Sequence, residues 1–491
     1  MHSFESRTGC PPAVRPFDVA VGPGRLSVEL ARCLLAGARE GLLTASMGTL
    51  EHARGGIVSR LCLLTLVLAA CLEAGCSLTL HGTPPTVTIN VDRGRPIAVS
   101  QLSLGVTHTE HDLDSGDPRA VSAASSLLRS TAVYQDQAMM GWGTQNPEPG
   151  PGRFDWSSLD ARMRLIQSSG GIAAITLCCA PDWMKGGVPG TTNWSQLNIA
   201  PTPDHYADFA SLAKAVARRY PWVLYFQVWN EMKGFWNFQA NRWDYEGYTT
   251  LYNDVYDALK SVNPAIQVGG PYVLVDNRPD HQGPSEFGNP TLHGSYGSVD
   301  PRVLDVLTYW LDHKHGADFV TLDGVSYING AELFAPGQAF ADVTTWIASQ
   351  TTLPVWWAEW YATPWGGQEY SNDQQDAVMT DALAQMMMAG ASVSLRWQPQ
   401  AAAGRNDENI WTDTSTPGGG QPLPFYYSAK ILHDDFLPGT LLYRASSSSA
   451  QVEAFASWWH VLAINKGGAA VTVGLGSTVR ALAPYGVMLL R

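Results

Sequence analysis

Residues 220–236, with the sequence YPWVLYFQVWNEMKGFW, decide how the fold of this chain is interpreted. Within them, residues 223–229 are a run of β-branched and aromatic side chains that is too short to favour a helix. Pro221 precedes the run and Gly234 follows it. The pattern is typical of a strand buried on both faces, as found in parallel sheets.

A carboxylate stands at the end of this predicted strand. Asn230 and Glu231 close it, and a basic and aromatic cluster follows, made of Lys233, Phe235 and Trp236. Water solvates a carboxylate poorly when aromatic rings cover it, and the loss of solvation raises its pKa. Glu231 is therefore a candidate general acid.

A second stretch, residues 353–365, repeats this pattern with the sequence LPVWWAEWYATPW. Its predicted strand begins at Val355 and ends at Glu359, which lies 128 residues after Glu231. One unit of an eight-unit β/α barrel takes roughly 30 to 40 residues, so this spacing is about three units. We expect both glutamates to face one cleft at the C-terminal rim. Two carboxyl groups flanking one sugar bond are what glycoside hydrolysis requires.

The rest of the central chain alternates between strand and helix patterns. Strands are predicted at residues 101–107, 127–134, 172–179, 223–229, 265–269, 319–327, 355–359 and 392–397. Helices are predicted at residues 156–169, 204–220, 245–262, 301–315, 339–350 and 373–389. About eight β/α units follow from this count, which predicts an α/β fold, a (β/α)8 TIM barrel, over residues 101–400. The long segment 276–299 is rich in Gly, Pro and His and is expected to be an active-site loop.

The pattern changes beyond residue 400. Gly, Ser and Pro turns separate short alternating strands, which predicts a small C-terminal β-sandwich over residues 401–491. Residues 86–92 also alternate like a strand but lie before the barrel. We expect the segment 83–100 to join the sandwich and so to connect the two domains.

Residues 1–82 are interpreted as a leader and linker. The apolar run 57–70 is too short to span a membrane comfortably and is typical of the core of a signal peptide. The tetrapeptide Leu68-Ala-Ala-Cys71 resembles a lipobox, in which Cys71 would be lipidated. Ordinary cleavage near Gly75 and translation from Met47 are the alternatives, and residues 1–46 are interpreted as a mis-called start. We expect a secreted or lipid-anchored protein of the cell envelope; an anchored tail facing the cytoplasm is the less favoured arrangement.

Composition narrows the class of partner. The chain carries a net charge of −13, which argues against nucleic acid or an anionic membrane surface. Only 15% of its 491 residues are charged, and it contains 18 Trp and 18 Tyr. These numbers predict a large core and aromatic surfaces suited to stacking on sugar rings, although most individual aromatic residues are expected to be core.

The cysteines give no sign of a metal or redox centre. Five of the seven lie in the first 76 residues, and the body of the chain contains only Cys178 and Cys179. No pair has the spacing of metal ligands, so neither a metal nor a cofactor is expected. Neighbouring residues of a strand point to opposite faces, so the two are predicted to be free, buried thiols.

Taken together, these motifs resemble a known family. Trp229-Asn230-Glu231 followed by Lys233-Gly-Phe-Trp236 resembles the acid/base motif of glycoside hydrolase family 39, whose members are retaining glycosidases on (β/α)8 barrels. Other similar segments are Arg129 with Asp136 and Met139, Gly152-Arg-Phe-Asp-Trp156, Ala180-Pro-Asp-Trp-Met184, Gly269-Gly-Pro271, Glu359-Trp360 and Trp397. The resemblance covers roughly residues 86–491.

The chain also departs from the family pattern. Met232 and Lys233 stand where the family usually has Pro and Asn, and Thr131 occupies the position of an expected histidine. The sixth strand ends in Ser326-Tyr327 rather than in a turn that carries histidine. These differences bear on a β-xylosidase-like sugar preference more than on the shared chemistry.

The resemblance implies roles for the two glutamates and their neighbours. Glu359 would be the nucleophile that forms a glycosyl-enzyme, and Glu231 would be the acid and then the base. Asn230 would bind the sugar 2-hydroxyl. Arg129 would hold Glu359 ionised and Tyr327 would orient it, although both side chains would serve equally well as structural hydrogen-bonding groups.

Four further residues are expected to line the cleft and bind substrate. Trp397 would form the floor by stacking on the sugar, with a place in the core as its alternative. Trp183 would form part of a wall, and core packing is equally expected for it. Lys233 and Trp236, from the basic and aromatic cluster after Glu231, complete this set.

Three classes of function remain open at this stage. The first is a retaining hydrolase of β-glycosidic bonds in an oligo- or polysaccharide, acting from chain ends like a β-xylosidase or, alternatively, within the chain. The second is a non-catalytic carbohydrate-binding protein on a degenerate barrel, and the third is a structural lipoprotein of the envelope. Both glutamates are present, which favours the first class. The sequence does not indicate the oligomeric state.

Overall fold

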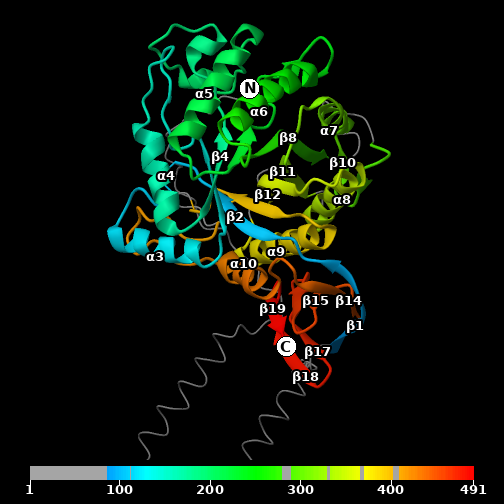
Figure 1. The fold of residues 1–491 in the computed structure, drawn as a ribbon. Helices are drawn as coiled ribbons and strands as arrows, with labels where there is room; N and C mark the ends of the chain where they lie inside the picture. The colour runs from blue at the N-terminus through cyan, green and yellow to red at the C-terminus, as the bar shows by residue number, and fades with distance from the viewer. Residues whose placement is uncertain (1–85, 111, 279–288, 329–331, 365–369, 402–408) are drawn as a thin grey trace, which may run out of the picture. The chain divides into compact units, whose positions relative to one another are not determined.

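The computed structural model describes residues 86–110, 112–278, 289–328, 332–364, 370–401 and 409–491 (Figure 1). The chain divides into two compact units, Met1–Gly82 and Thr83–Arg491, and the described residues belong to the second. The predicted leader, including Cys71, lies outside the described residues.

Eight parallel strands close into a barrel, which confirms the predicted TIM-barrel fold. They are β2 (Ser103–Thr107), β3 (Tyr134–Ala138), β4 (Ile172–Leu177), β5 (Tyr225–Val228), β8 (Gln267–Arg278), β11 (Phe319–Ile328), β12 (Val355–Pro364) and β13 (Val393–Trp397). Each strand pairs in parallel with the next, and β13 pairs with β2 to complete the ring. In a closed parallel barrel all C-terminal strand ends meet at one rim, which is where such folds build their sites.

Among the described residues, eight α-helices surround the barrel (Figure 1). They are α3 (Pro118–Arg129), α4 (Ser157–Ser169), α5 (Tyr206–Arg219), α6 (Tyr245–Val262), α7 (Pro301–His313), α8 (Ala335–Gln350), α9 (Asn372–Ala389) and α10 (Pro424–Asp435). The predicted helix over residues 245–262 coincides with α6, and Gly170, in a left-handed conformation, ends α4. In the described ranges, no helix combines the length and apolarity needed to cross a membrane.

The prediction of a strand over residues 127–134 is wrong. Asp117 caps a helix, since its carboxylate accepts from the backbone N–H groups of Arg119 and Ala120, and Pro118 occupies the first turn. The helix runs to Arg129, and the strand begins only at Tyr134. The apolar run combined the buried last turn of a helix with the start of a strand, so its composition did not separate them.

Helix α10 was not predicted, and it shows that the barrel extends beyond residue 400. Its buried residues Phe425, Ala429 and Leu432 repeat at helical spacing, which is a signal present in the sequence. The helix contacts α9 and β2 and thus occupies the place of the last helix of the barrel. The β-domain strands that follow begin at Leu441.

The second domain is one mixed sheet of seven strands. Its order is β18 (Thr478–Leu482), β17 (Val471–Leu475), β1 (Thr86–Val99), β14 (Leu441–Ser447), β15 (Val452–Ser457), β16 (Val461–Asn465) and β19 (Val487–Leu490). The N-terminal strand β1 lies between β17 and β14, and Figure 1 shows it in blue beside red and orange strands. The sheet curls until its edge strands β18 and β19 touch, and it encloses a separate apolar core.

The loop predicted over residues 276–299 is partly regular. Strand β8 continues to Arg278, far beyond the predicted end at Gly269. The short strands β9 (His293–Gly294) and β10 (Gly297–Val299) form a hairpin, and β10 pairs antiparallel with β8. Residues 279–288 lie outside the described residues.

The two body cysteines are joined in a disulfide, so the prediction of free thiols is wrong. Cys178 and Cys179 follow β4, which ends at Leu177, and are linked by a cis peptide bond. The rule that neighbours point to opposite faces holds only within a strand, and these residues lie beyond its end. Both are fully buried.

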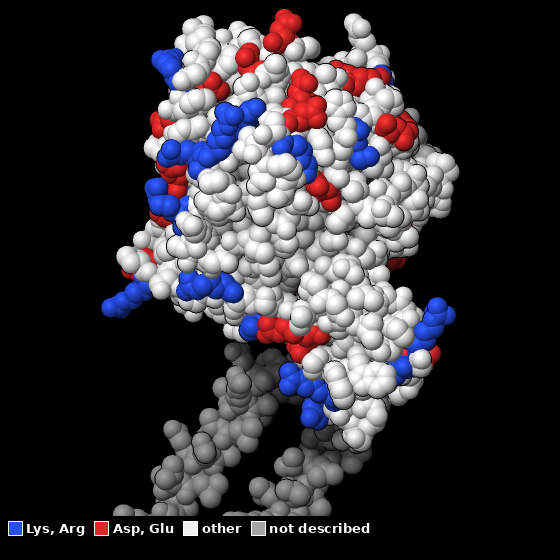
Figure 2. Space-filling model, in the orientation of Figure 1, with Lys and Arg blue, Asp and Glu red and all other residues white. Residues whose placement is uncertain are grey.

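Charged side chains on the face shown in Figure 2 are of mixed sign. Basic and acidic groups alternate over the part that holds α5, α6 and α7, and a broad zone below them is uncharged. On this face, the described basic residues do not form a separate stripe of the kind that tracks a phosphate backbone.

Candidate active site

Three carboxyl groups meet at the C-terminal rim of the barrel. One oxygen from each of Glu231, Asp323 and Glu359 lies within 4.8 Å of an oxygen of each of the others. The structure therefore brings together the two glutamates that the sequence singled out. It adds an aspartate that the sequence analysis missed.

A β-bulge sets Asp323 and Glu359 level with each other. Leu322 of β11 pairs with Trp357 of β12, but the next pair is Asp323 with Glu359, so Ala358 is skipped. Paired residues on neighbouring strands share a face, and both side chains are buried, at 0% and 7% exposure. Bulges of this kind commonly redirect side chains beside active sites.

A tight turn after β5 places Glu231. The strand ends at Val228, and Trp229, Glu231 and Met232 adopt left-handed backbone conformations with φ of 70°, 49° and 53°. The indole Nε1 of Trp229 donates to the carbonyl of Lys233 at 2.7 Å, which ties the turn together. The left-handed region is sparsely populated by non-glycine residues, and its use here is typical of a functional turn.

Hydrogen-bond donors surround the Glu359 carboxylate. The amide of Asn230 and the hydroxyl of Tyr272 each lie 3.4 Å from Oε2, and the hydroxyl of Tyr361 donates to Oε1. Burial raises the pKa of Glu359, the nearby charge of Glu231 adds to this, and donation from Tyr361 opposes it. The pKa of Glu359 is about 7 as a result.

The environment of Glu231 corrects the expected direction of its pKa. Burial acts to raise it, but contact with Asp323 and the ammonium of Lys233 outweigh burial, so the pKa of Glu231 is lowered. Lys233 forms an ion pair with Glu231 and donates to Asn230 Oδ1 at 3.0 Å. The prediction based the pKa on the aromatic cover alone and did not include Asp323 or the charge of Lys233, although Lys233 is part of the same cluster.

Asp323 is the most buried of the three carboxyl groups. Burial raises its pKa well above the usual range, and the charges of Glu359 and Glu231 act in the same direction. Neither of its oxygens has a well-aligned hydrogen-bond partner, although Glu231 is close enough to interact directly. The signal in the sequence was an aspartate inside an apolar strand, since Asp is almost never fully buried without a partner or a function.

Two tyrosines of the site were also missed. Tyr272 is skipped in the pairing of β8 with β11, between Pro271 and Val273, and its φ is 52°. Tyr361 lies two residues after Glu359 and so shares its face of β12. Both fall beyond the predicted strand ends at Gly269 and Glu359, so the lengths assigned to the strands concealed them.

Of the remaining predicted site residues, Trp397 lies beside the carboxyl groups and Trp183 packs as a core residue. The half-buried Trp397 ends β13, and its ring meets the ring of Tyr361 edge-on at 5.5 Å, so it lies beside the site. Trp183 is 8% exposed and donates to the Glu148 carbonyl at 3.0 Å, as a residue anchored in the core does. The side chain of Tyr327 lies outside what the structure describes.

Trp236 belongs to a hairpin that follows the Glu231 turn. It lies in β6 (Trp236–Asn237), which pairs with β7 (Arg242–Trp243). Its ring meets Trp243 edge-on at 5.1 Å, and the guanidinium of Arg302 lies 4.7 Å from its centroid. The described contacts of Trp236 are thus with the hairpin and α7 rather than with the carboxyl groups.

Arg129 cannot hold Glu359 ionised. It is exposed at the C-terminal end of α3, where its guanidinium donates to the hydroxyl of Ser126 at 3.1 Å. A helix that precedes β3 ends near the N-terminal end of that strand, opposite the catalytic rim. The buried arginine near the nucleophile strand is Arg396, whose guanidinium donates to the Trp360 carbonyl at 2.7 Å and lies 5.5 Å from the Tyr361 ring centroid.

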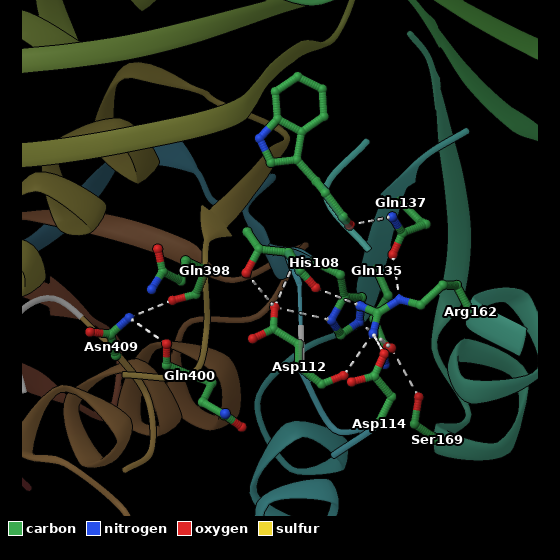
Figure 3. Close-up of polar contacts among 12 residues, drawn as sticks. His108, Asp112, Asp114, Gln135, Gln137, Arg162, Ser169, Gln398, Gln400 and Asn409 are labelled. Atoms are coloured by element: carbon green, nitrogen blue, oxygen red, sulfur yellow. Dashed lines mark hydrogen bonds and ion pairs between the residues drawn. The ribbon is translucent and has the colours of Figure 1, made fainter. Parts of the chain in front are cut away.

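A polar network fixes the loops on the other side of the rim (Figure 3). Arg162 of α4 donates to Gln137 Oε1 at 2.8 Å and to the Thr109 carbonyl at 3.1 Å. Gln137 in turn donates to the carbonyl of Trp142 at 3.0 Å. The ammonium of Lys233 lies 5.3 Å from the Trp142 ring centroid, so the network also supports the cation that pairs with Glu231.

His108, which follows β2, belongs to this network, and its Nε2 lies 3.1 Å from Gln135 Oε1. A second set of contacts follows β13, where Asn409 donates to the carbonyls of Gln398 and Gln400 at 2.6 and 3.1 Å. In Figure 3 no dashed line joins the two sets. Loops fixed in this way give the carboxyl groups a rigid support.

Among the described residues, the three carboxyl groups are also the only cluster with the spacing of cation ligands. A cation there would compete with the Lys233 ammonium for Glu231. It would also have to displace protons, because the pKa values of Asp323 and Glu359 are raised. The arrangement is better suited to proton transfer and to attack by a carboxylate than to metal binding.

Three solved structures of similar fold share little sequence identity with this chain. The protein SrfJ from Salmonella typhimurium has a TM-score of 0.55 and 12% identity, over 83% of this chain and 92% of that one. A conserved exported protein from Bacteroides fragilis has the same score and identity, over 83% and 98%. A monomeric beta-xylosidase from Caulobacter crescentus CB15 has a TM-score of 0.51 and 17% identity, over 79% and 83%. At these identities the likeness concerns the fold.

Comparison of the sequence with protein families identifies the family more specifically than the fold does. No curated protein sequence matches the chain. Residues 144–392, however, match the glycosyl hydrolases family 39. This segment is just over half of the chain and contains β4 to β12, with both glutamates and Asp323. The protein therefore belongs to glycosyl hydrolases family 39 and is a glycosidase.

Proposed function

We propose that this glycosidase cleaves β-glycosidic bonds with retention of configuration, with Glu359 as nucleophile and Glu231 as acid and base. The observation that supports this most directly is the spacing of the carboxyl oxygens, within 4.8 Å. Retaining enzymes hold their two carboxyl groups about 5 to 5.5 Å apart, whereas inverting enzymes need about 6.5 to 9.5 Å to admit a water. The gap between Glu231 and Glu359 is therefore suited to direct attack.

In the first step, Glu359 attacks the anomeric carbon as the bond to the leaving oxygen breaks. Glu231 supplies the proton that this oxygen takes. Donation from Tyr272 and Tyr361 orients the attacking carboxylate and stabilises its ionised form. Asn230 contacts both Glu359 and Lys233, which supports a role for its amide in binding the sugar 2-hydroxyl.

In the second step, a water attacks the glycosyl-enzyme while Glu231 takes up its proton. Esterification removes the negative charge of Glu359, and this lowers the pKa of Glu231 further and suits it to act as a base. In the free enzyme the pKa of Glu231 is lowered and that of Glu359 is raised. Before the first step, Glu231 must therefore gain a proton and Glu359 must be ionised. Carboxyl groups this close titrate as a coupled set rather than singly.

We also propose that the enzyme acts from the ends of oligo- or polysaccharide chains. The likeness to the beta-xylosidase supports this choice, and the departures at Thr131, Met232 and Lys233 leave the preferred sugar open. Cleavage within chains is the competing mode. Product length separates them, because an enzyme acting from chain ends releases monosaccharide from the start, whereas internal cleavage first lowers viscosity.

We propose that the protein acts at the cell envelope, attached through a lipid on Cys71 or released after cleavage of the leader. The apolar run 57–70 and the lipobox-like tetrapeptide support this. Labelling of the full chain with a radioactive fatty acid tests it. Incorporation that is lost in Cys71→Ala indicates a lipoprotein, whereas unlabelled protein in the medium indicates ordinary secretion.

The decisive experiment uses the protein beginning at Thr83 and a panel of aryl β-glycosides and soluble polysaccharides. Product anomers are followed by NMR for the wild type, Glu231→Gln, Glu359→Gln and the control Glu453→Gln. Glu453 lies in the β-domain and pairs with Lys466, so its change should leave activity unaltered. Retained configuration that is lost in both site variants supports the proposal. Inverted products, or near-full activity of Glu359→Gln, would refute it, and glycan binding without hydrolysis would favour the binding-protein alternative.

A further inference from the structure

Asp323 has no part in the two-glutamate mechanism, yet it lies at its centre. Its side chain is 0% exposed, and neither oxygen has a well-aligned hydrogen-bond partner. The titratable groups that face it are Glu231 and Lys233 from the turn after β5, Glu359 and Tyr361 from β12, and Tyr272 from β8. Only Lys233 among these five groups is a cation. Burial and the two neighbouring glutamates outweigh it, so Asp323 is most stable with its proton bound.

Glu231 is in the opposite condition. Lys233 pairs directly with it and holds it as a carboxylate, although the first step needs it to carry a proton. Asp323 contacts Glu231 from β11 and can supply one, whereas Glu359 must itself be ionised to attack. The acid/base function is therefore divided between two carboxyl groups in this chain.

We propose that Asp323 stores the proton that Glu231 delivers to the leaving oxygen. The inference rests on the proposed retaining mechanism and concerns how its proton is held between turnovers. Asp323 is fully buried, at 0% exposure, and contacts Glu231, so in this proposal it acts through Glu231 rather than on the sugar. Lys233, two residues after Glu231, is the cation that keeps Glu231 ionised. For this reason a second group has to hold the proton between turnovers.

The proton movements balance over one turnover. In the first step the O–H bond of Asp323 breaks as an O–H bond forms on Glu231, and Glu231 releases this proton to the leaving oxygen as the glycosidic bond breaks. The Asp323 carboxylate formed in this way is tolerated because Glu359 becomes a neutral ester in the same step. In the second step the attacking water gives a proton to Glu231, which returns it to Asp323 as Glu359 is released with its negative charge.

A second buried aspartate, Asp136, serves as a control for a purely structural role of Asp323. Asp136 of β3 is also 0% exposed, but Thr176 donates to its Oδ2 at 2.7 Å, and a chain of neutral groups continues through Gln227 to Thr321. One oxygen of Asp136 therefore has a neutral donor, whereas its Oδ1 has no aligned partner, and Glu231 is not among the groups that act on Asp136. A change at Asp136 thus reports what the loss of a buried acid does to the barrel alone.

The test compares leaving groups. Asp323→Asn keeps the size of the side chain and can still donate to Glu231, but it cannot release a proton. We expect it to lower kcat/KM about 100-fold for an alkyl β-glycoside, whose leaving oxygen must be protonated, and less than about fivefold for the dinitrophenyl glycoside of the same sugar. The basic limb of its pH profile with the alkyl substrate should move to lower pH, because Glu231 beside Lys233 then holds the only transferable proton.

Controls separate this inference from the proposed function. Glu231→Gln should show the same dependence on the leaving group, and Asp136→Asn should show none. If the wild type hydrolyses nothing, or inverts configuration, the proposed function fails. If the wild type retains configuration but Asp323→Asn loses both substrates equally, or loses neither, the proton-store assignment is overturned.

A measurement on the unaltered protein guards against a variant that fails to fold. Carbon-13 labelling of aspartate carboxyl groups allows the protonation of Asp323 to be followed by NMR, with Asp323→Asn or the pattern of neighbouring shifts used for assignment. We expect a protonated Asp323 at pH 7 and its ionisation when Glu359 is trapped as a fluorosugar ester. An Asp323 signal that is ionised at pH 7 in the free enzyme would overturn the proposal.

Discussion

A single buried carboxyl group, that of Asp136, and a cluster of three at the rim lie in the same barrel and differ in what surrounds them. Asp136 is deep between the strands, and hydroxyl and amide groups of neighbouring strands donate to it. Glu231, Asp323 and Glu359 lie at the rim, where they face one another and a single ammonium. Burial alone therefore does not mark a chemical site. What distinguishes the rim is the mutual repulsion of three neighbouring carboxyl groups.

The largest effect is expected from Glu359→Gln. Without a nucleophile no glycosyl-enzyme forms, and kcat should fall by roughly 10⁴-fold or more, by analogy with the loss of other nucleophiles. Stopped assays with the best aryl glycoside measure this, with Glu453→Gln as the control. A loss as large in Asp136→Asn would erase the distinction between the two groups.

Glu231→Gln should act more selectively. General acid catalysis contributes about 10²- to 10⁴-fold, so we expect a loss of that size with alkyl leaving groups and a small one in the first step with dinitrophenyl leaving groups. The leaving-group series is read as a plot of log kcat/KM against leaving-group pKa, which should become steeper. A slope equal to that of the wild type would remove Glu231 from the acid role.

Lys233→Met sharpens the comparison by removing the cation of the rim cluster. Lys233 lowers the pKa of both Glu231 and Glu359, so both pKa values should rise when it is replaced. The nucleophile then ionises at higher pH and the acid keeps its proton to higher pH. We expect the whole profile of kcat/KM to move to higher pH, by about one unit, as measured from pH 4 to 10. A profile that does not move would show that Lys233 is only structural.

Tyr361→Phe should change one limb only. Its hydroxyl stabilises the ionised form of Glu359, so its loss raises the pKa of Glu359 above about 7. The acidic limb of the profile should move to higher pH while the basic limb stays. A hydrogen bond to a charged group is worth about 1.5 to 3 kcal/mol, so we expect roughly 10- to 100-fold lower kcat/KM near pH 6. Equal shifts of both limbs would contradict the assignment.

Asp136→Asn should affect stability rather than catalysis. The folded pKa of Asp136 is raised from 3.8 to about 7, so its stabilising contribution is complete below the unfolded pKa and is lost as pH rises through about 7. The variant lacks this loss and should be more stable than the wild type at pH 8, by at most roughly 4 kcal/mol, and similar at pH 4. Urea unfolding at the two pH values measures the difference. A variant that is equally destabilised at both would indicate that the aspartate is needed for packing.

Much of the barrel was predictable because its signals are local. The mostly apolar run 223–229 contains the strand β5 (Tyr225–Val228), and residues 245–262 form a helix because their apolar spacing is helical. The pairing of Glu231 and Glu359 followed from their place at strand ends three units apart. These inferences need only neighbouring residues and the regular geometry of the fold.

The errors have a common cause in contacts between distant segments. Arg129 was placed on a strand because its neighbours are apolar, and only packing shows that Leu128 is buried as the end of a helix. The direction of the Glu231 pKa depends on Asp323, which lies 92 residues later in the chain. The Cys178–Cys179 disulfide depends on where β4 ends.

Local patterns were enough to predict the fold class and two of the carboxyl groups, because strand and helix periods and residues at strand ends are properties of short segments. The proton affinities of these groups could not be predicted in this way. The β-bulge at Ala358 and the left-handed turn at Glu231 bring Asp323, Lys233 and two tyrosines together, and electrostatic interactions at these distances are set by position rather than by composition. Proton affinities at the site are therefore a property of the folded barrel.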